Sequence, residues 1–412
     1  MNIDLSQLSY TGSVRGFPGS RVTAHFEDGK LFARIELFGA EYPAHELIYV
    51  EPAWRYFGNS PSNSSLIAYR ARDVTNDIWQ YMQNDGVRVN QTDSAFHRDD
   101  HKQRIRREAE YEYVAGTSKT SCPVYLVADH QFCKQIGDGS EGRTGAFMLQ
   151  VMERVNSYYR RTEFDSNIKE KFGFTIKGLE VHCNPSEKPV FNEGGKDWTY
   201  DRGYEDFLYA FSVDGRWQSY CLAHLFTYRS WTSGTLGLGF IASPDVYSVG
   251  GVCSASTWKA GAARFINTAW SSYCDPRGAR VLQMQGDVIT AHELGHNWGA
   301  EHDPDTSECA PNANHYIMYP HSSTGSDPNN LVFSPCSKRT IARVLKSKSG
   351  KCFDERTTAV CGNGLIEKAA GEECDVGFTT DAASDRCCDS KTCKLKRLLS
   401  AYIDVATIRN TC

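Results

Sequence analysis

Residues 292–303 read HELGHNWGAEHD, and this stretch decides how the middle of the chain folds. On a helix His292 and His296 are four residues apart, so both imidazoles project from one face about one turn apart. That spacing suits two ligands of one tetrahedral zinc ion. Glu293 stands beside the first ligand and can reach water at the metal without binding the metal. The stretch therefore predicts a metal site, with His302 as the third ligand.

The residues around the two histidines predict where this helix begins and ends. Asp287 is a suitable N-cap. Ile289, Leu294 and Trp298 can face the core, and Gly299 is a suitable C-terminal stop. A glycine there also permits the sharp turn that brings the third histidine back to the other two.

The motif predicts hydrolysis of peptide bonds. A bare His–Glu–x–x–His occurs by chance, but requiring Gly299 and His302 as well lowers the chance rate to roughly 10⁻⁴ per chain. One zinc ion per chain, held by three neutral imidazoles, lowers the pKa of water at its fourth position to about 7. Glu293 would accept a proton from that water and pass it to the departing amine, which makes it the expected catalytic residue.

Composition and cysteine content indicate an ordinary globular protein from an oxidising compartment. The 412 residues carry 45 Lys plus Arg against 50 Asp plus Glu, a net charge of −5, so no nucleic-acid partner is expected. Fifteen cysteines, with sequons at Asn63 and Asn90, favour the secretory pathway. We see neither a signal peptide nor an apolar stretch of about 20 residues, and we expect an incomplete chain.

The chain divides into three regions: 1–107, 108–357 and 358–412. In the first, residues 22–26 and 31–37 alternate apolar and polar side chains around Asp28-Gly29, which predicts a β-hairpin. The region ends in Arg104-Ile105-Arg106-Arg107, which suits a proprotein convertase, with Arg104, Arg106 and Arg107 as its recognition residues. A solvated basic loop and a nucleic-acid patch are the alternatives.

The middle region predicts a mixed α/β domain with a sheet at its centre. Residues 124–128 and 222–227 are short apolar runs typical of buried strands. Between them, residues 147–159 place apolar side chains at helical spacing. Strands that alternate with a helix indicate a sheet covered by helices.

These motifs resemble the metzincin zinc endopeptidases. Tyr316-Ile317-Met318-Tyr319 matches the methionine turn beneath the metal, although Met318 taken alone could be a core methionine. Asp303 resembles the adamalysin branch, the disintegrin and metalloproteinases. The stretches CLAHLFTYR, GTLGL, GGVC and ECAP resemble its sheddases, and SRVTAHFEDG resembles their prodomain.

The resemblance covers most of residues 20–393 and implies a zymogen. It implies a β-rich prodomain over 1–107, a metzincin-like α/β (α+β) catalytic domain over 108–357 with a twisted mixed sheet and an active-site helix, and an incomplete disintegrin-like module over 358–412. It implies an edge strand at Thr235, Leu236 and Gly237 that binds extended substrate, which could otherwise be a plain core or edge strand. It also implies the disulfides Cys122–Cys221, Cys253–Cys352 and Cys309–Cys336.

The sequence departs from the family pattern at three places. The prodomain of the relatives carries a cysteine that caps the zinc, whereas this chain has none before Cys122. Steric occlusion by residues 1–107, acting as the chain's own inhibitor, is the expected substitute. The polar run 321–324 predicts a specificity pocket of altered shape or polarity. Three cysteines have no family partner, so two could pair and at least one is left over: Cys133, Cys183 and Cys274.

The dense cysteines of residues 358–412 predict a small module that depends on disulfide bridges for its stability. Glu372, Glu373 and Asp375 leave a calcium site or a generic spacer as alternatives to a disintegrin-like start.

The leading hypothesis is a zinc endopeptidase that sheds ectodomains of membrane-anchored proteins at the cell surface, with a membrane anchor expected outside this chain. The alternatives are a secreted protease and a catalytically silent adhesion protein acting through the last module.

Overall fold

The computed structural model describes residues 10–17, 20–27, 30–37, 46–53, 56, 65–74, 85–88 and 118–355, together with 371, 373, 388–389, 392 and 394–395. Within 118–355 it leaves out 186–188, 194–195, 199, 201, 260, 312–314 and 322–327. The chain forms two compact units, one of residues 1–70 with 355–412 and the other of residues 71–354. In the described parts, no helix is both long and apolar enough to cross a bilayer.

The first unit contains an antiparallel sheet in which neighbouring strands follow one another in sequence. Its strands are β1 (Tyr10–Gly12), β2 (Ser20–Glu27), β3 (Lys30–Leu37), β4 (Glu46–Pro52) and β5 (Leu66–Arg70). Glu27 pairs with Lys30 at the turn between β2 and β3, which confirms the predicted hairpin. On the adjoining pair, the Tyr49 and Tyr69 rings stack with centroids 5.7 Å apart. A small hairpin joins β15 (Cys388–Asp389) and β16 (Lys394–Leu395).

The second unit is built on a mixed sheet. β8 (Gly173–Val181), β7 (Lys119–Ala128), β9 (Leu222–Thr227) and β13 (Thr268–Ser272) pair in parallel. β10 (Gly237–Phe240) pairs antiparallel with β13 and parallel with the short β6 (Gly86–Val87). The two predicted buried strands correspond to β7 and β9 and are confirmed.

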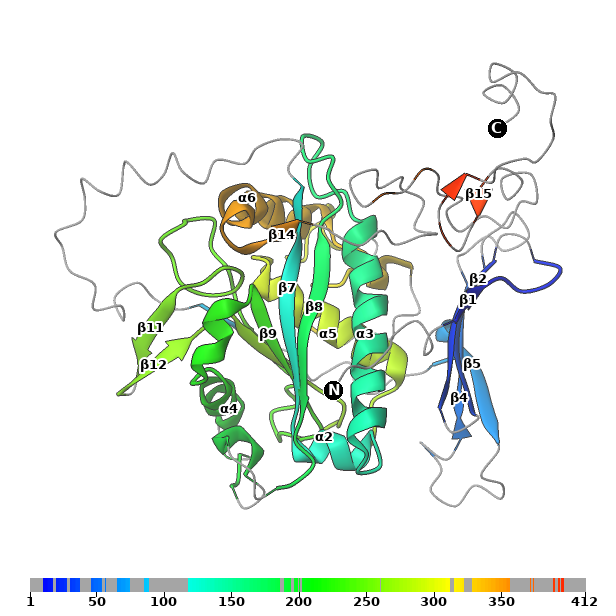
Figure 1. Cartoon of the computed structure of the whole chain (residues 1–412), viewed down its shortest axis with the longest axis horizontal. Coiled ribbons are helices and arrows are strands. Elements are labelled where there is room, and N and C mark those ends of the chain that lie inside the picture. Colours follow the sequence, from blue (N-terminus) through cyan, green and yellow to red (C-terminus); the bar gives the residue numbers. More distant parts are fainter. Residues whose placement is uncertain are drawn as a thin grey trace. The chain divides into compact units, whose positions relative to one another are not determined.

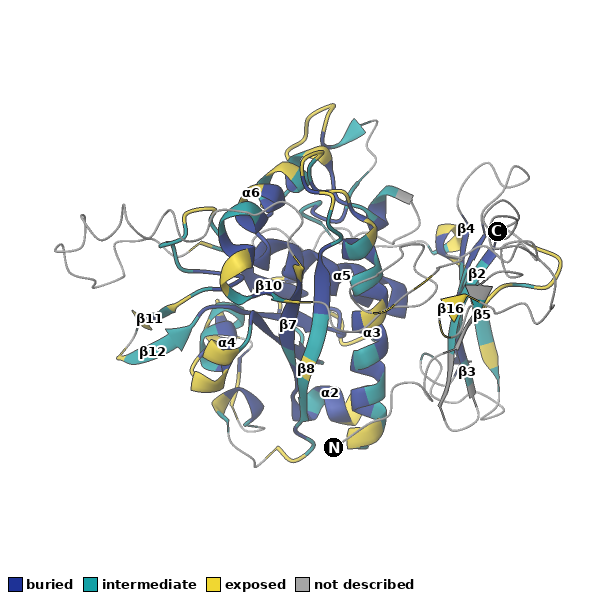
Figure 2. Cartoon of the chain, turned by 45° about the horizontal axis from the view of Figure 1, so that its top comes forward, coloured by how far each residue is buried: buried dark blue, intermediate teal, exposed yellow. Residues whose placement is uncertain are grey.

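Helices cover both faces of this sheet (Figure 1). α4 (Gly203–Phe211) packs its apolar side against one face, where Trp270 and Phe240 contribute to a common core. α3 (Glu141–Arg161) and α5 (Gln283–Asn297) cover the other face. The predicted helix over 147–159 is confirmed within α3. Figure 2 shows α5 buried along its length, between the sheet and α3.

β14 (Asp354–Glu355) adds to the mixed sheet beside β7, and β11 (Ser256–Lys259) with β12 (Ala262–Phe265) forms a separate antiparallel pair. The other described helices are the long α6 (Pro335–Cys352) and the short α2 (His130–Gln135), η3 (Ala71–Asp73), η7 (Val190–Asn192), η8 (Gly215–Ser219) and η10 (Pro328–Leu331).

Asp287 lies inside α5 and is not its N-cap, so that prediction was wrong. The helix begins at Gln283, four residues earlier. The fully buried Asp287 carboxylate accepts two hydrogen bonds from Arg154 of α3, at 2.5 and 2.9 Å. A charge that seemed to mark a helix end therefore ties two helices together, because a buried carboxylate requires a paired partner.

Aromatic packing holds the C-terminal end of α5. The Tyr159 ring of α3 lies 4.8 Å from Trp298, 4.7 Å from Phe174 and 5.0 Å from Phe333, centroid to centroid. The Tyr159 hydroxyl donates to the carbonyl of Ala291, one residue before the first histidine of the motif. Edge-to-face packing of buried rings gives this end of the helix a fixed position.

Four disulfides lie in the second unit. Three join the pairs that the family resemblance implies, Cys122–Cys221, Cys253–Cys352 and Cys309–Cys336. The fourth joins Cys133 to Cys183. Of the cysteines whose side chains are described, Cys274 stands outside any disulfide, and burial raises the pKa of its thiol to about 11.

His224 makes the stability of this unit sensitive to acid. The ring is fully buried in β9, with Nε2 3.0 Å from the Ser271 hydroxyl, and burial lowers its pKa from 6.5 to about 3. Between those pH values the unfolded chain binds the extra proton, so stability falls as the pH falls. We expect this group to cost up to about 1.4 kcal/mol of unfolding free energy per pH unit below pH 6. Urea unfolding at pH 7 and pH 5 should show that His224→Gln loses less unfolding free energy between the two pH values than wild type does. Equal losses in the two proteins would contradict this assignment.

Candidate metal centre

α5 places two imidazoles against each other. The Nε2 atoms of His292 and His296 are 3.1 Å apart, and both rings are almost fully buried. The His302 ring lies against both, with centroids 5.2 and 5.0 Å away. One nitrogen from each ring and a carboxylate oxygen of Asp85 all lie within 4.8 Å of one another. The structure thus brings the three predicted ligands together and adds a fourth group that we did not predict.

The outer nitrogens of the two helix histidines fix their tautomers. His292 Nδ1–H donates to the Ile317 carbonyl at 2.7 Å, and His296 Nδ1–H donates to the Ala300 carbonyl at 2.8 Å. With Nδ1 protonated, each Nε2 of a neutral ring carries a lone pair directed at the shared centre. Converging lone pairs at this distance fit a cation, and a set of histidines with a carboxylate fits zinc.

A turn after α5 returns the third ligand. Gly299 has φ +100°, a left-handed conformation that favours glycine, and the next amide, of Ala300, donates to the Gly295 carbonyl. This confirms the predicted helix stop. His302 then reaches the two helix histidines while remaining 25% exposed, which is the most open side of the centre.

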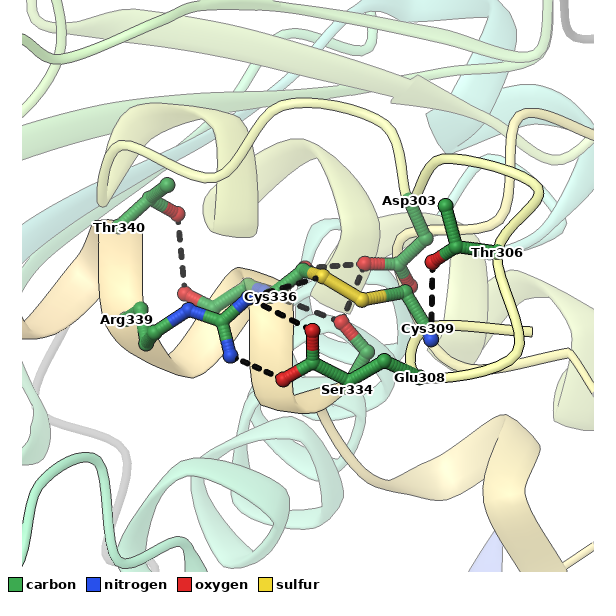
Figure 3. The surroundings of a disulfide bond; sticks show 9 residues. Asp303, Thr306, Glu308, Cys309, Ser334, Cys336, Arg339 and Thr340 are labelled. Carbon is green, nitrogen blue, oxygen red and sulfur yellow. Dashed lines mark hydrogen bonds and ion pairs between the residues drawn. A yellow bond between two sulfur atoms is a disulfide. The ribbon is translucent and has the colours of Figure 1, made fainter. Parts of the chain in front are cut away.

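Asp303 fixes the loop that carries the third ligand. Its buried carboxylate accepts hydrogen bonds from the hydroxyls of Ser334 and Ser337, the latter at 2.7 Å, at the start of α6. Its amide donates to the Met318 carbonyl at 2.8 Å. Figure 3 shows Asp303 beside Ser334 and the Cys309–Cys336 disulfide. Asp303 thus joins its own loop to the start of α6 through its carboxylate and to the methionine turn through its amide.

Met318 lies beneath the helix. It is fully buried, and a Cβ added at Gly295 would lie 2.4 Å from its sulfur, so the turn and the helix are in close contact. The preceding residue, Ile317, supplies the carbonyl that orients His292. The methionine turn thus supports one ligand directly.

We expect Asp303→Ala, which removes the acceptor of both serine hydroxyls, to weaken metal binding about 10- to 100-fold, because groups that orient metal ligands have effects of that size. The matched control is Asp305→Ala, which removes an exposed carboxylate two residues further along. Competition with a chelator measures both affinities. Equal affinities in the two variants would show that the Asp303 network does not position His302.

Glu293 is fully buried, with its side chain against the main chain of Gly237 in β10. Neither carboxylate oxygen has a hydrogen-bond partner among the described residues. Burial first, and the nearby Asp85 carboxylate second, raise the pKa of Glu293 well above its ordinary value. A carboxyl group held unpartnered beside a metal centre is suited to exchange protons with a reactant.

The predicted substrate residues lie at and just before β10. The Leu236 carbonyl accepts from the Ser272 amide of β13, so the main-chain carbonyl of Leu236 is directed toward the neighbouring strand inside the sheet. By the alternation of a strand, Gly237 and Gly239 direct their main-chain groups to the opposite, outer edge. The Gly239 amide is bonded there to the Asp85 carbonyl at 2.9 Å. Thr235 precedes the strand, and its hydroxyl is 2.9 Å from that of Ser233.

Several predicted features lie outside the described residues. They are the convertase residues Arg104, Arg106 and Arg107, both sequons, residues 322–324 of the polar run, and Glu372 and Asp375 of the last module. His321 is described and packs its ring near that of Tyr319, at 5.3 Å.

The proteins that this chain resembles are metallopeptidases. The family model "Metallo-peptidase family M12" matches residues 118–334. The disintegrin and metalloproteinase domain-containing protein 17 homolog of Caenorhabditis elegans is 33% identical over 68% of this chain and 44% of its own length. Disintegrin and metalloproteinase domain-containing protein 10 of Bos taurus is 30% identical over 96% of this chain and 54% of its own length. The human counterpart is 29% identical, over 94% and 52% respectively. The chain thus spans about half the length of these relatives.

Proposed function

Because the chain belongs to metallo-peptidase family M12, we propose that it is a metalloendopeptidase that binds one zinc ion and sheds ectodomains. Its substrates would be juxtamembrane stalks of membrane-anchored proteins. The observation that carries this proposal is the convergence of three imidazoles beside the buried Glu293, whose carboxylate has no hydrogen-bond partner among the described residues. The relatives' names, which pair a disintegrin with a metalloproteinase, agree with this choice.

In this proposal the chain's own residues hold the metal and transfer the protons. Zinc, when bound, supplies a Lewis acid that polarises a carbonyl and acidifies water. Glu293 takes a proton from the attacking water and delivers it to the amine that leaves. The fixed tautomers of His292 and His296 direct a lone pair of each Nε2 at the metal position, and the packing of α5 against α3 holds the two rings in place.

The outer edge of β10 supports recognition of extended peptide. The amides of Gly239 and Ile241 are directed outward and donate to a second strand at 2.9 Å each. A substrate that adds a strand at this edge would be bound through its main chain, with little demand on its side chains. An unfolded stalk segment next to a membrane can adopt that conformation, whereas a folded domain cannot.

Processing and location follow from the same proposal. A proprotein convertase would cut after Arg107, in the secretory pathway, and residues 1–107 would inhibit the enzyme until then. The enzyme would act at the cell surface, where its substrates are anchored.

The test is cleavage of a stalk-peptide library by the full chain after convertase treatment. We expect cleavage of stalk peptides, loss with a chelator and recovery with one equivalent of zinc. Intact folded domains, which bury their own extended segments, serve as the matched control and should not be cleaved. Failure of the zinc-loaded, convertase-cut chain to cleave any stalk peptide would reject the proposal.

A further inference from the structure

A short segment far from the motif enters the metal centre. Asp85 is completely buried, and its Oδ1 lies 3.2 Å from His296 Nε2 and close to His302 Nε2. Its Oδ2 lies 3.4 Å from His292 Nε2. All three predicted ligands therefore face one carboxylate, which lies 211 residues before His296 in the sequence.

The main chain around Asp85 is held as an added strand. β6 pairs in parallel with β10, with Gly86 opposite Gly239 and Val87 opposite Phe240. The Asp85 and Val87 carbonyls accept from the amides of Gly239 and Ile241. Those are the same outward amides that extended substrate would require. Residues 85–88 thus occupy the substrate edge.

The flanking residues fit this position. A Cβ at residue 86 would lie 2.6 Å from Ile241 Cδ1 and 3.0 Å from His296 Cε1, so glycine allows the close approach. Arg88 forms an ion pair with Glu301, the residue next to His302. The segment is therefore anchored on the C-terminal side of Asp85, by strand pairing and by this ion pair.

We propose that Asp85 is the fourth metal ligand of the uncut chain and keeps the enzyme latent. It would take the place of the prodomain cysteine that caps the metal in the relatives, since residues 1–107 contain no cysteine. The inference rests on the proposed function, because latency needs an activity to suppress. Carboxylate oxygen is an ordinary zinc ligand, and it would complete a tetrahedral set with the three imidazoles. It would leave no position for water.

The segment blocks the site without presenting a bond to cut. The Asp85 carbonyl accepts from the Gly239 amide, so the side chain of this residue, and not its carbonyl, faces the three histidines. While residues 85–88 are covalently attached, they bind at a high effective concentration. A cut after Arg107 removes that advantage and lets substrate compete.

The first test asks whether residue 85 touches the metal. In a Glu293→Gln background, with Arg104 and Arg107 changed to alanine so that the chain stays uncut, Asp85→Cys is loaded with Co²⁺. A thiolate bound to cobalt gives a strong near-ultraviolet charge-transfer band. We expect that band in Asp85→Cys and not in the matched control Val87→Cys, two residues further along the chain, in β6. Absence of the band from Asp85→Cys would overturn the proposal.

The second test asks whether Asp85 excludes ligands. A fluorescent hydroxamate, which chelates zinc and needs its open position, is titrated against the uncut zinc-loaded chain with native Glu293. We expect Asp85→Ala to bind the probe at least about tenfold more tightly than the uncut wild type. Equal affinities would overturn latency through this carboxylate. Tight probe binding without cleavage of any stalk peptide would instead leave latency intact and reject the proposed substrate.

Discussion

Replacing Glu293 by glutamine is expected to lower kcat/KM for peptide hydrolysis by about 10² to 10⁴, the range typical of losing a positioned general base. That range corresponds to about 3 to 5 kcal/mol of lost transition-state stabilisation. The amide keeps the shape of the buried side chain against Gly237 but cannot accept the proton. The effect should appear in kcat, because Glu293 is not a metal ligand and zinc content should remain at one per chain.

The convertase-cut chain is the right material, since β6 occupies the substrate edge before cleavage. Glu308→Gln is the matched control, because Glu308 is an exposed glutamate that pairs with Arg339 (Figure 3) and does not belong to the group of residues at the histidines. It should retain wild-type kcat. A Glu293→Gln protein that keeps its zinc and cleaves as fast as the control would remove Glu293 from the mechanism.

Arg154→Met is expected to destabilise the second unit by about 3 to 5 kcal/mol, the usual cost of leaving a buried charge unpaired. The side chain of Arg154 is 6% exposed and that of Asp287 is fully buried. For a unit of this size the change should lower Tm by roughly 6 to 20 °C. Because Asp287 lies on α5, ahead of the ligands, the same change should weaken metal binding.

Arg143→Met is the matched control, on the same helix α3. Arg143 pairs with Asp138 at the surface, 3.0 Å apart, and a pair of this kind is worth about 0 to 1 kcal/mol. Calorimetry of the Glu293→Gln background, which cannot digest itself, measures all variants. We also expect Arg154→Met combined with Asp287→Leu to recover much of the loss, since no charge then stays buried. A single variant as stable as Arg143→Met would show that the pair does not stabilise the helix packing.

Local patterns in the sequence were enough to predict the histidine-bearing helix and the residue that ends it. His292 and His296 share a face because any helix repeats every 3.6 residues, and Gly299 ends this one because glycine readily takes the left-handed turn. The apolar runs of β7 and β9 and the periodicity of α3 are local signals of the same kind. Each was predicted from residues within about one element of one another.

The tertiary structure decided everything that depends on distant residues. Asp287 looks like an N-cap in the sequence, but Arg154, 133 residues away, makes it an interior partner. No local pattern predicts that Cys133 pairs with Cys183. None predicts that Ser334 and Ser337 donate hydrogen bonds to Asp303 either. Asp85 is followed by glycine, and this dipeptide is common in turns, so the sequence around it does not indicate a metal ligand. Only pairing of β6 with β10 brings it to the histidines, because strand pairing between distant segments depends on the whole fold and not on local spacing.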